Sequence, residues 1–161
     1  MGSDSDYPTM EESCKVLEQF DTAYEILVTS AHRSPGRTQT YIREAKKRGI
    51  KVLIAGAGGA AHLAGVLAAE TVLPVVGVPI PSTPLKGLDS LLSINQMPAG
   101  VPVATMAIGK AGARNAGLLA VQILALSDAK LTVKLQRFKK KAAREVEIKD
   151  QKLQSSHAQN R

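Results

Sequence analysis

The sequence has no tryptophan, few other aromatic residues and a single cysteine among its 161 residues. One cysteine excludes an internal disulfide and any metal site built from several thiolates. No apolar run is long enough to span a bilayer and no secretory pattern opens the chain, so we expect no membrane partner and no export. Together these absences predict a protein of a reducing, cytoplasmic setting.

Signatures of common nucleotide-binding and hydrolytic sites are also missing. There is no GxxxxGK[ST] motif, which argues against a P-loop nucleotidase, and no serine lies in a GxSxG elbow. Gly56, Gly58 and Gly59 do not complete GxGxxG because position 61 is alanine, and no acidic residue ends a strand about 20 residues further on. The two internal histidines have no cluster of carboxylates nearby, so we predict no metal site.

The residues that are present favour an α/β domain built from small aliphatic side chains. The chain is 44% hydrophobic and carries a net charge of +7. Much of the excess charge falls near the C-terminus, at Lys134, Arg137, Lys139, Lys140, Lys141 and Arg144. With basic residues at helical spacing and little aromatic interleaving, we interpret this segment as a solvated helix face and predict no nucleic-acid partner.

Apolar spacing predicts strands that alternate with helices, which indicates a parallel sheet covered by helices on both faces. The expected strands are 24–29, 51–55, 75–78 and 101–106. The expected helices are 8–20, 35–48, one that follows the glycine-rich stretch and ends at about residue 70, 85–97, 111–126 and 129–152. Residues 1–154 are therefore expected to form a single α/β domain with a long C-terminal helix, and residues 155–161 a disordered tail.

Three polar turns are placed to meet at the carboxyl ends of parallel strands, where ligands bind in such sheets. They are residues 2–7, 30–35 and the glycine-rich stretch 56–63. The last two follow predicted strands, but only Met1 precedes the first. We therefore expect that the first strand of the sheet is missing from this sequence.

Two histidines are candidates for chemistry at these turns. His32 follows a predicted strand end beside Arg33, and imidazole exchanges protons readily near neutral pH. His62 lies at the start of a predicted helix, where it could serve as a hydrogen-bonding group. For both residues the sequence leaves a structural alternative open, namely a surface-loop histidine for His32 and a packing role for His62.

A second polar cluster suits a phosphorylated sugar. Ser3 and Ser5 lie at a helix start, where hydroxyls and free amides favour phosphate. The Asp6 carboxylate can accept hydrogen bonds from ribose hydroxyls or cap the helix that follows it. Arg33 offers a two-pronged donor for phosphate.

Seven motifs then follow one another in the order found in one enzyme family. They are residues 2–6 (GSDSD), 30–33 (SAHR), 55–63 (AGAGGAAHL), 77–79 (GVP), 88–93 (LDSLLS), 96–98 (QMP) and 100–105 (GVPVAT). Over residues 2–126 the chain resembles the class I N5-carboxyaminoimidazole ribonucleotide mutases of de novo purine biosynthesis. The resemblance implies a three-layer, flavodoxin-like, doubly wound parallel sheet, an assembly of eight copies and a ribonucleotide substrate.

The resemblance also implies the reaction and the residues that serve it. A carboxylate moves from the exocyclic nitrogen to a ring carbon, with His32 as general acid and base and no metal, ATP or biotin. The residues carried over as substrate-binding are Ser3, Asp6 and Arg33, with Ser5, Ser30, Gly58, Gly59, His62 and Leu63 lining the same pocket. The enzyme could be paired functionally with the synthetase that makes its substrate.

Two other interpretations stay open at this point. The chain could be an aminoimidazole ribonucleotide carboxylase that uses carbon dioxide directly. It could also be a nucleotide-binding module without catalytic activity.

Overall fold

A computed structural model describes residues 1–158 of the chain. The chain divides into two compact units, Met1–Ile123 and Leu124–Arg161. Among residues 1–158, no helix has both the length and the apolar character needed to cross a membrane.

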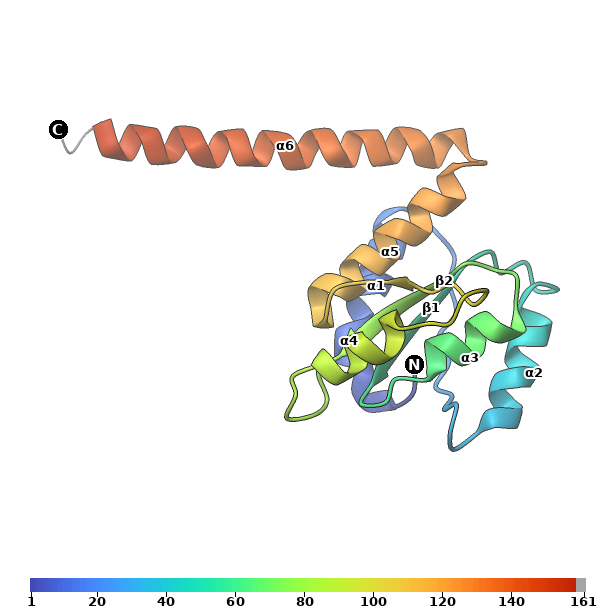
Figure 1. Ribbon diagram of the computed structural model, residues 1–161. Coiled ribbons are helices and arrows are strands. Elements are labelled where there is room, and N and C mark those ends of the chain that lie inside the picture. The colour runs from blue at the N-terminus through green and yellow to red at the C-terminus, as the bar shows by residue number, and fades with distance from the viewer. Residues whose placement is uncertain (159–161) are drawn as a thin grey trace. The chain divides into compact units, whose positions relative to one another are not determined.

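The first unit is built on a parallel sheet with the strand order β1-β2-β3 (Figure 1). Its strands are β1 (Leu53–Gly58), β2 (Val75–Ile80) and β3 (Ala104–Thr105). Every residue of β2 is buried, which agrees with its continuous run of aliphatic residues, since a central parallel strand is covered on both faces. The predicted parallel α/β architecture is confirmed.

Helices cover both faces of this sheet and form the outer two of three layers (Figure 1). They are α1 (Tyr7–Gln19), α2 (Pro35–Ala45), α3 (Leu63–Glu70), α4 (Leu88–Asn95) and α5 (Gly109–Ala125). Met10 of α1 and Ala113 and Ala116 of α5 pack with Val76 and Val78 on one face.

The opposite face carries the second half of the core. Ile42 of α2, Leu67 of α3 and Ile94 of α4 pack there against Ala55 and Ala57 of β1. The side chains of β1 thus alternate between the two faces of the sheet, as the period-two geometry of a strand requires. This alternation determines which β1 side chains face each half of the core. The carboxyl end of β1 lies at the pocket described below.

The expected strand 24–29 is not formed. Within residues 1–158, the backbone bonds of this segment to another part of the chain run to Met1, through Met1 N–H to the Leu27 carbonyl (2.9 Å) and Thr29 N–H to the Met1 carbonyl (2.9 Å). These two bonds are those of one position in a parallel ladder. A strand needs a neighbour along its length, and a single pairing position does not supply one.

Other boundaries shift for identifiable reasons. The expected strand 101–106 shortens to two residues, because Pro102 has no N–H to give to a ladder. Strand β2 continues through Pro79. At this position β2 pairs with β1 but no longer with β3, so the missing N–H of proline leaves no ladder bond unmade on that side. Helix α4 covers only the middle of the expected helix 85–97, since Gly87 before it has a left-handed backbone with φ of 91°.

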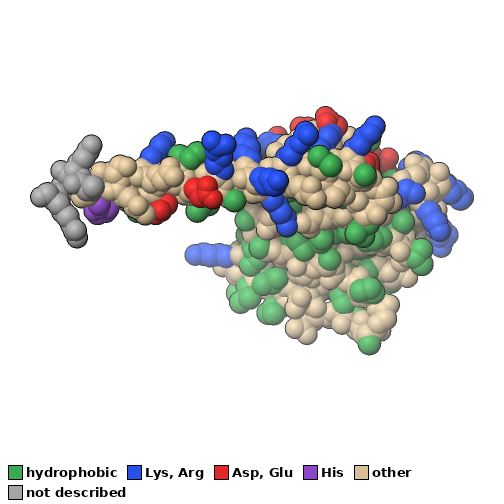
Figure 2. Space-filling model, turned by 90° about the horizontal axis from the view of Figure 1, so that it is seen from above, with side chains coloured by type: hydrophobic (Ala, Val, Ile, Leu, Met, Phe, Trp, Pro, Cys, Tyr) green, Lys and Arg blue, Asp and Glu red, His purple; other side chains and the backbone are tan. Residues whose placement is uncertain are grey.

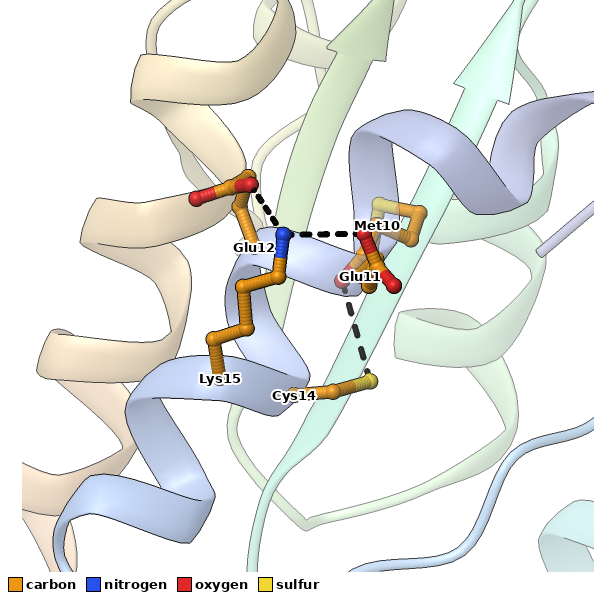
Figure 3. A network of polar contacts seen from close by, with 5 residues as sticks. All are labelled: Met10, Glu11, Glu12, Cys14 and Lys15. Carbon is orange, nitrogen blue, oxygen red and sulfur yellow. Dashed lines mark hydrogen bonds and ion pairs between the residues drawn. The ribbon is translucent and has the colours of Figure 1, made fainter.

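The exposed face of α1 carries a small charged network (Figure 3). Lys15 lies 2.9 Å from Glu11 and 2.8 Å from Glu12, and these bonds raise the pKa of Lys15. The pairs are open to water, where such contacts add little to stability. Cys14 contacts the backbone carbonyl of Met10 on the same helix.

The second unit consists chiefly of α6 (Ala129–Ala158), a 30-residue helix. Lys and Arg side chains follow it along its length (Figure 2). The helix continues past its expected end at residue 152 and overlaps the start of the expected tail. Residues 159–161 lie outside the described part of the chain.

Candidate active site

A pocket of about 310 Å³ opens at the carboxyl end of β1, where the three predicted turns meet a fourth loop. Its lining consists of Gly2, Ser3, Ser5, Asp6, Ser30, Ala31, His32, Arg33, Ala57, Gly58, Ala61, His62, Leu63 and Ser82. Every site residue named from the sequence lines this pocket except Gly59. Their roles toward a substrate stay predictions.

The N-terminal turn holds its side chains by bonds within itself. Ser3 caps the short 3-10 helix η1 (Asp4–Asp6), accepting from Ser5 N–H, while the Asp6 carboxylate accepts from Ser3 N–H at 3.0 Å. Asp6 is only 4% exposed, and burial is the main cause that raises its pKa. The turn therefore presents hydroxyls at the surface of the pocket with a carboxylate close beneath them.

The second turn, residues 30–34, is braced in the same way. Ser34 Oγ accepts from Ser30 N–H at 2.9 Å, and Ser30 Oγ accepts from Arg33 N–H at 3.1 Å. The Arg33 guanidinium donates to the Gly2 carbonyl at 3.1 Å, which ties this turn to the N-terminal one. His32 is thereby carried on a loop whose backbone is fixed by its own side chains.

The glycine turn follows β1 directly and leads into α3. Gly59 and Ala61 have positive φ angles of 60° and 44°, and Ala61 N–H bonds back to the Gly58 carbonyl at 3.1 Å. Gly58 lines the pocket at the start of this tight turn, and Gly59, the next residue, does not. It also places His62 at the first turn of α3, beside Leu63.

His32 and His62 contact each other across the pocket. His32 Nε2 lies 2.6 Å from His62 Nδ1, and the two rings meet edge to face, with an interplanar angle of 76°. A contact this short needs a proton between the two nitrogens, so one ring donates and the other accepts. The sequence named both histidines but gave no reason to expect that they touch.

Ser82 is a lining residue that the sequence analysis did not find. It lies two residues beyond the end of β2, between the expected strand 75–78 and the expected helix 85–97, where the sequence suggested no site residue. A signal was available, because hydroxyl residues after a second parallel strand reach the same edge of the sheet as those after the first.

Within residues 1–158, no group of three or more His, Cys, Asp or Glu side chains is placed to hold a metal ion. The expectation of a reaction without metal stays a prediction.

The fold and the pocket define a flavodoxin-like α/β protein with a pocket lined by polar residues at the ends of its parallel strands. The sequence profile of the AIR carboxylase family matches residues 1–145. The chain therefore belongs to the AIR carboxylase family.

Individual relatives agree with this assignment. The chain is 60% identical over 135 residues to the N5-carboxyaminoimidazole ribonucleotide mutase of Bacillus subtilis, covering 84% of this chain and 83% of the relative. It is 55% identical over 154 residues to the protein of the same name from Pyrococcus horikoshii, covering 96% and 86%. The crystal structure of Treponema denticola PurE superposes with a TM-score of 0.87 at 27% identity, covering 95% of this chain and 94% of that one.

Proposed function

We propose that the chain is an N5-carboxyaminoimidazole ribonucleotide mutase, which makes the 4-carboxy isomer in de novo purine biosynthesis. The observation that carries the proposal is identity of 52–60% over most of the chain to relatives that bear this name. The pocket contains the types of group that this substrate requires, which supports the same conclusion.

Each part of the substrate has a matching group in the pocket. The guanidinium of Arg33 suits the phosphate, since its donors form a rigid fork. Ser3 and Ser5 supply hydroxyls for the same anion, and the Asp6 carboxylate can accept from the ribose hydroxyls. His32, on the next turn, is left to exchange protons with the imidazole part of the substrate.

The proposed reaction passes a single proton from His32 to the substrate and back. It consumes no other reactant. Protonated His32 gives its proton to the carbamate nitrogen, the bond from nitrogen to the carboxyl carbon breaks, and its electron pair stays on nitrogen. The electron-rich ring carbon forms a bond to the carbon dioxide released. His32 removes the proton from that ring carbon, which restores both the aromatic ring and the protonated histidine.

The test is to supply purified protein with the N5-carboxylated substrate and to follow formation of the 4-carboxy isomer. Rapid conversion without ATP is the expected result. Conversion of free aminoimidazole ribonucleotide only, with a strict requirement for bicarbonate, would identify a carboxylase instead. Binding of the ribonucleotide with no turnover would identify a non-catalytic module.

The proposal extends to assembly into eight copies. Helix α6 carries exposed apolar side chains, with Val146 65% and Leu153 59% exposed, which are suited to burial against further copies. Light scattering of the purified protein measures the mass of the assembly directly. The cytoplasmic setting and the functional pairing with the preceding synthetase stay predictions.

A further inference from the structure

Ser82 lies on the wall of the pocket, at a turn that follows β2. Gly58 and Ile80 are paired at the ends of β1 and β2, and the chain turns sharply beyond Ile80, where Ser82 N–H bonds to the Ile80 carbonyl at 3.0 Å. This turn brings the serine back over the end of the neighbouring strand. The Ser82 side chain therefore faces the same pocket as His32.

Gly58 makes room for this serine. A Cβ atom at position 58 would lie 1.9 Å from Ser82 Oγ and 2.9 Å from Ser82 Cβ, distances at which no side chain could remain in place. The hydroxyl of Ser82 is thus packed directly on the glycine backbone. The absence of a Cβ at position 58 leaves the space that this hydroxyl occupies.

The neighbouring hydroxyls are used within the protein, whereas that of Ser82 is not. Thr83 Oγ1 donates to Asp89 at 2.7 Å, Ser90 Oγ donates to the Ile80 carbonyl at 2.9 Å, and Ser93 donates to the Ala60 carbonyl. Among residues 1–158, Ser82 Oγ has no protein hydrogen-bond partner. A positioned hydroxyl on a pocket wall is therefore available to a ligand.

The pocket has two sides, and Ser82 belongs to the side of the reacting atoms. Arg33 is tied through Gly2 to the turn of Ser3 and Asp6, which together suit the ribose phosphate. Ser82 instead packs on the glycine turn, which carries His62 and, through it, contacts His32. A group bound against Ser82 would thus lie against the glycine turn, in the same pocket as His32.

We propose that Ser82 is a further substrate-contacting residue, whose hydroxyl donates a hydrogen bond to the migrating carboxylate and holds the carbon dioxide in place between the two steps. This inference rests on the proposed mutase function. Ser82 keeps its own proton throughout, so the bond changes are those given above for His32. Its contribution is to keep the released carbon dioxide near the ring carbon.

The test is the variant Ser82→Ala, assayed with the N5-carboxylated substrate for both the 4-carboxy isomer and released aminoimidazole ribonucleotide. We expect kcat/KM to fall about tenfold, the loss typical of a hydrogen bond to a charged group. We also expect a larger share of turnovers to end in released aminoimidazole ribonucleotide. Affinity for aminoimidazole ribonucleotide itself, which lacks the carboxylate, should stay unchanged.

A matched control separates the hydroxyl from the shape of its loop. Thr83→Ala removes the bond to Asp89 from the same loop and should leave both rate and product ratio as in the wild type. Gly58→Ala should displace the Ser82 side chain and raise the share of released ribonucleotide, and adding Ser82→Ala to it should change that share little further.

Three outcomes overturn the inference. If Ser82→Ala keeps the wild-type rate and product ratio, the hydroxyl does not contact the carboxylate. If Thr83→Ala lowers the rate and raises the share of released ribonucleotide as Ser82→Ala does, then loss of order in the loop, and not loss of the Ser82 hydroxyl, causes the change. If wild-type protein does not convert the substrate at all, the proposed function fails and the inference fails with it.

Discussion

His32 Nε2 and His62 Nδ1 are 2.6 Å apart, although the two residues are separated by 30 positions and lie on different turns. Because one proton lies between these nitrogens, the protonation of one ring fixes which nitrogen of the other carries hydrogen. We therefore expect His62 to act as a positioning residue for His32. The relationship leads to two predictions that distinguish the two rings.

Replacing His32 by asparagine should abolish most of the conversion and leave ligand binding intact. A positioned general acid and base contributes about 10²–10⁴-fold to rate, so kcat should fall by that range. Affinity for aminoimidazole ribonucleotide, measured by calorimetry, should change little because the residues proposed to bind the phosphate and the ribose are left in place. Wild-type turnover by the His32→Asn protein would show that another group transfers the proton.

Replacing His62 by alanine should lower kcat by a smaller factor. The change removes one hydrogen bond, worth about 1 kcal/mol, which corresponds to roughly fivefold in rate. His62→Gln, which can still accept a hydrogen bond, should recover part of the loss. A kcat as low as that of His32→Asn would mean that His62 itself exchanges protons with the substrate.

The pH dependence of binding should report on Asp6. Burial raises the pKa of its carboxyl group, so this group takes up a proton at a higher pH than an exposed aspartate does. The affinity for aminoimidazole ribonucleotide should therefore weaken as the pH falls through that raised value. Asp6→Asn should bind more weakly and without this pH dependence, which calorimetry at several pH values measures.

The effect of Asp6 on stability should have the opposite sign. The folded protein holds this proton more tightly than the unfolded chain. The free energy of unfolding contributed by Asp6 is therefore greatest below the ordinary aspartate pKa and declines as the pH rises to the raised value. Urea titrations of wild-type and Asp6→Asn protein should differ in this acidic window, and parallel curves would contradict the assignment.

The packing of α5 on α1 should tolerate no added methyl group at Gly117. A Cβ atom there would lie 2.9 Å from the Ser13 carbonyl oxygen and 3.0 Å from Val16 Cβ. We expect Gly117→Ala to destabilise the protein by about 1–3 kcal/mol in urea unfolding.

Gly36, in the first turn of α2, provides the matched control, because nothing lies within 4 Å of its added Cβ. Gly36→Ala should stabilise the protein by about 0.5–1 kcal/mol, since alanine loses less conformational freedom on folding. Equal effects of the two substitutions would show that helix propensity, and not the contact with α1, decides stability at Gly117.

The sequence predicts those parts of the fold in which local pattern and tertiary context agree. The order of strand, glycine turn and helix in this region is confirmed, because an apolar run, turn residues and helix formers follow one another. The expected bounds of the strand, 51–55, were shifted, since β1 begins at Leu53 and continues into the glycines as far as Gly58. The segment 24–29 has an equally good strand pattern and fails. An alternating apolar pattern is typical of a segment that pairs with a neighbouring strand. Within residues 1–158 its backbone bonds to another part of the chain run to Met1, and one residue does not form a ladder.

The candidate site could be anticipated residue by residue, but its internal geometry could not. The positions of Ser3, His32 and Gly58 follow from the rule that polar turns gather at strand ends. The contact between His32 and His62 depends on how the two turns that carry them are placed relative to each other in the fold. No local sequence pattern encodes that placement. Ser82 was missed because it belongs to none of the polar turns that the sequence singled out, and its place beside Gly58 depends on a contact between two strand ends that no local pattern encodes.

The backbone of residues 24–28 also has a consequence for how the protein is handled. Tyr24, Ile26 and Val28 are 41–46% exposed in a stretch without helix or sheet. Proteases bind their substrates as extended strands and cleave where the chain is not committed to its own hydrogen bonds. Limited digestion should therefore cut the first unit here before it cuts any helix, separating α1 from the turn that carries His32.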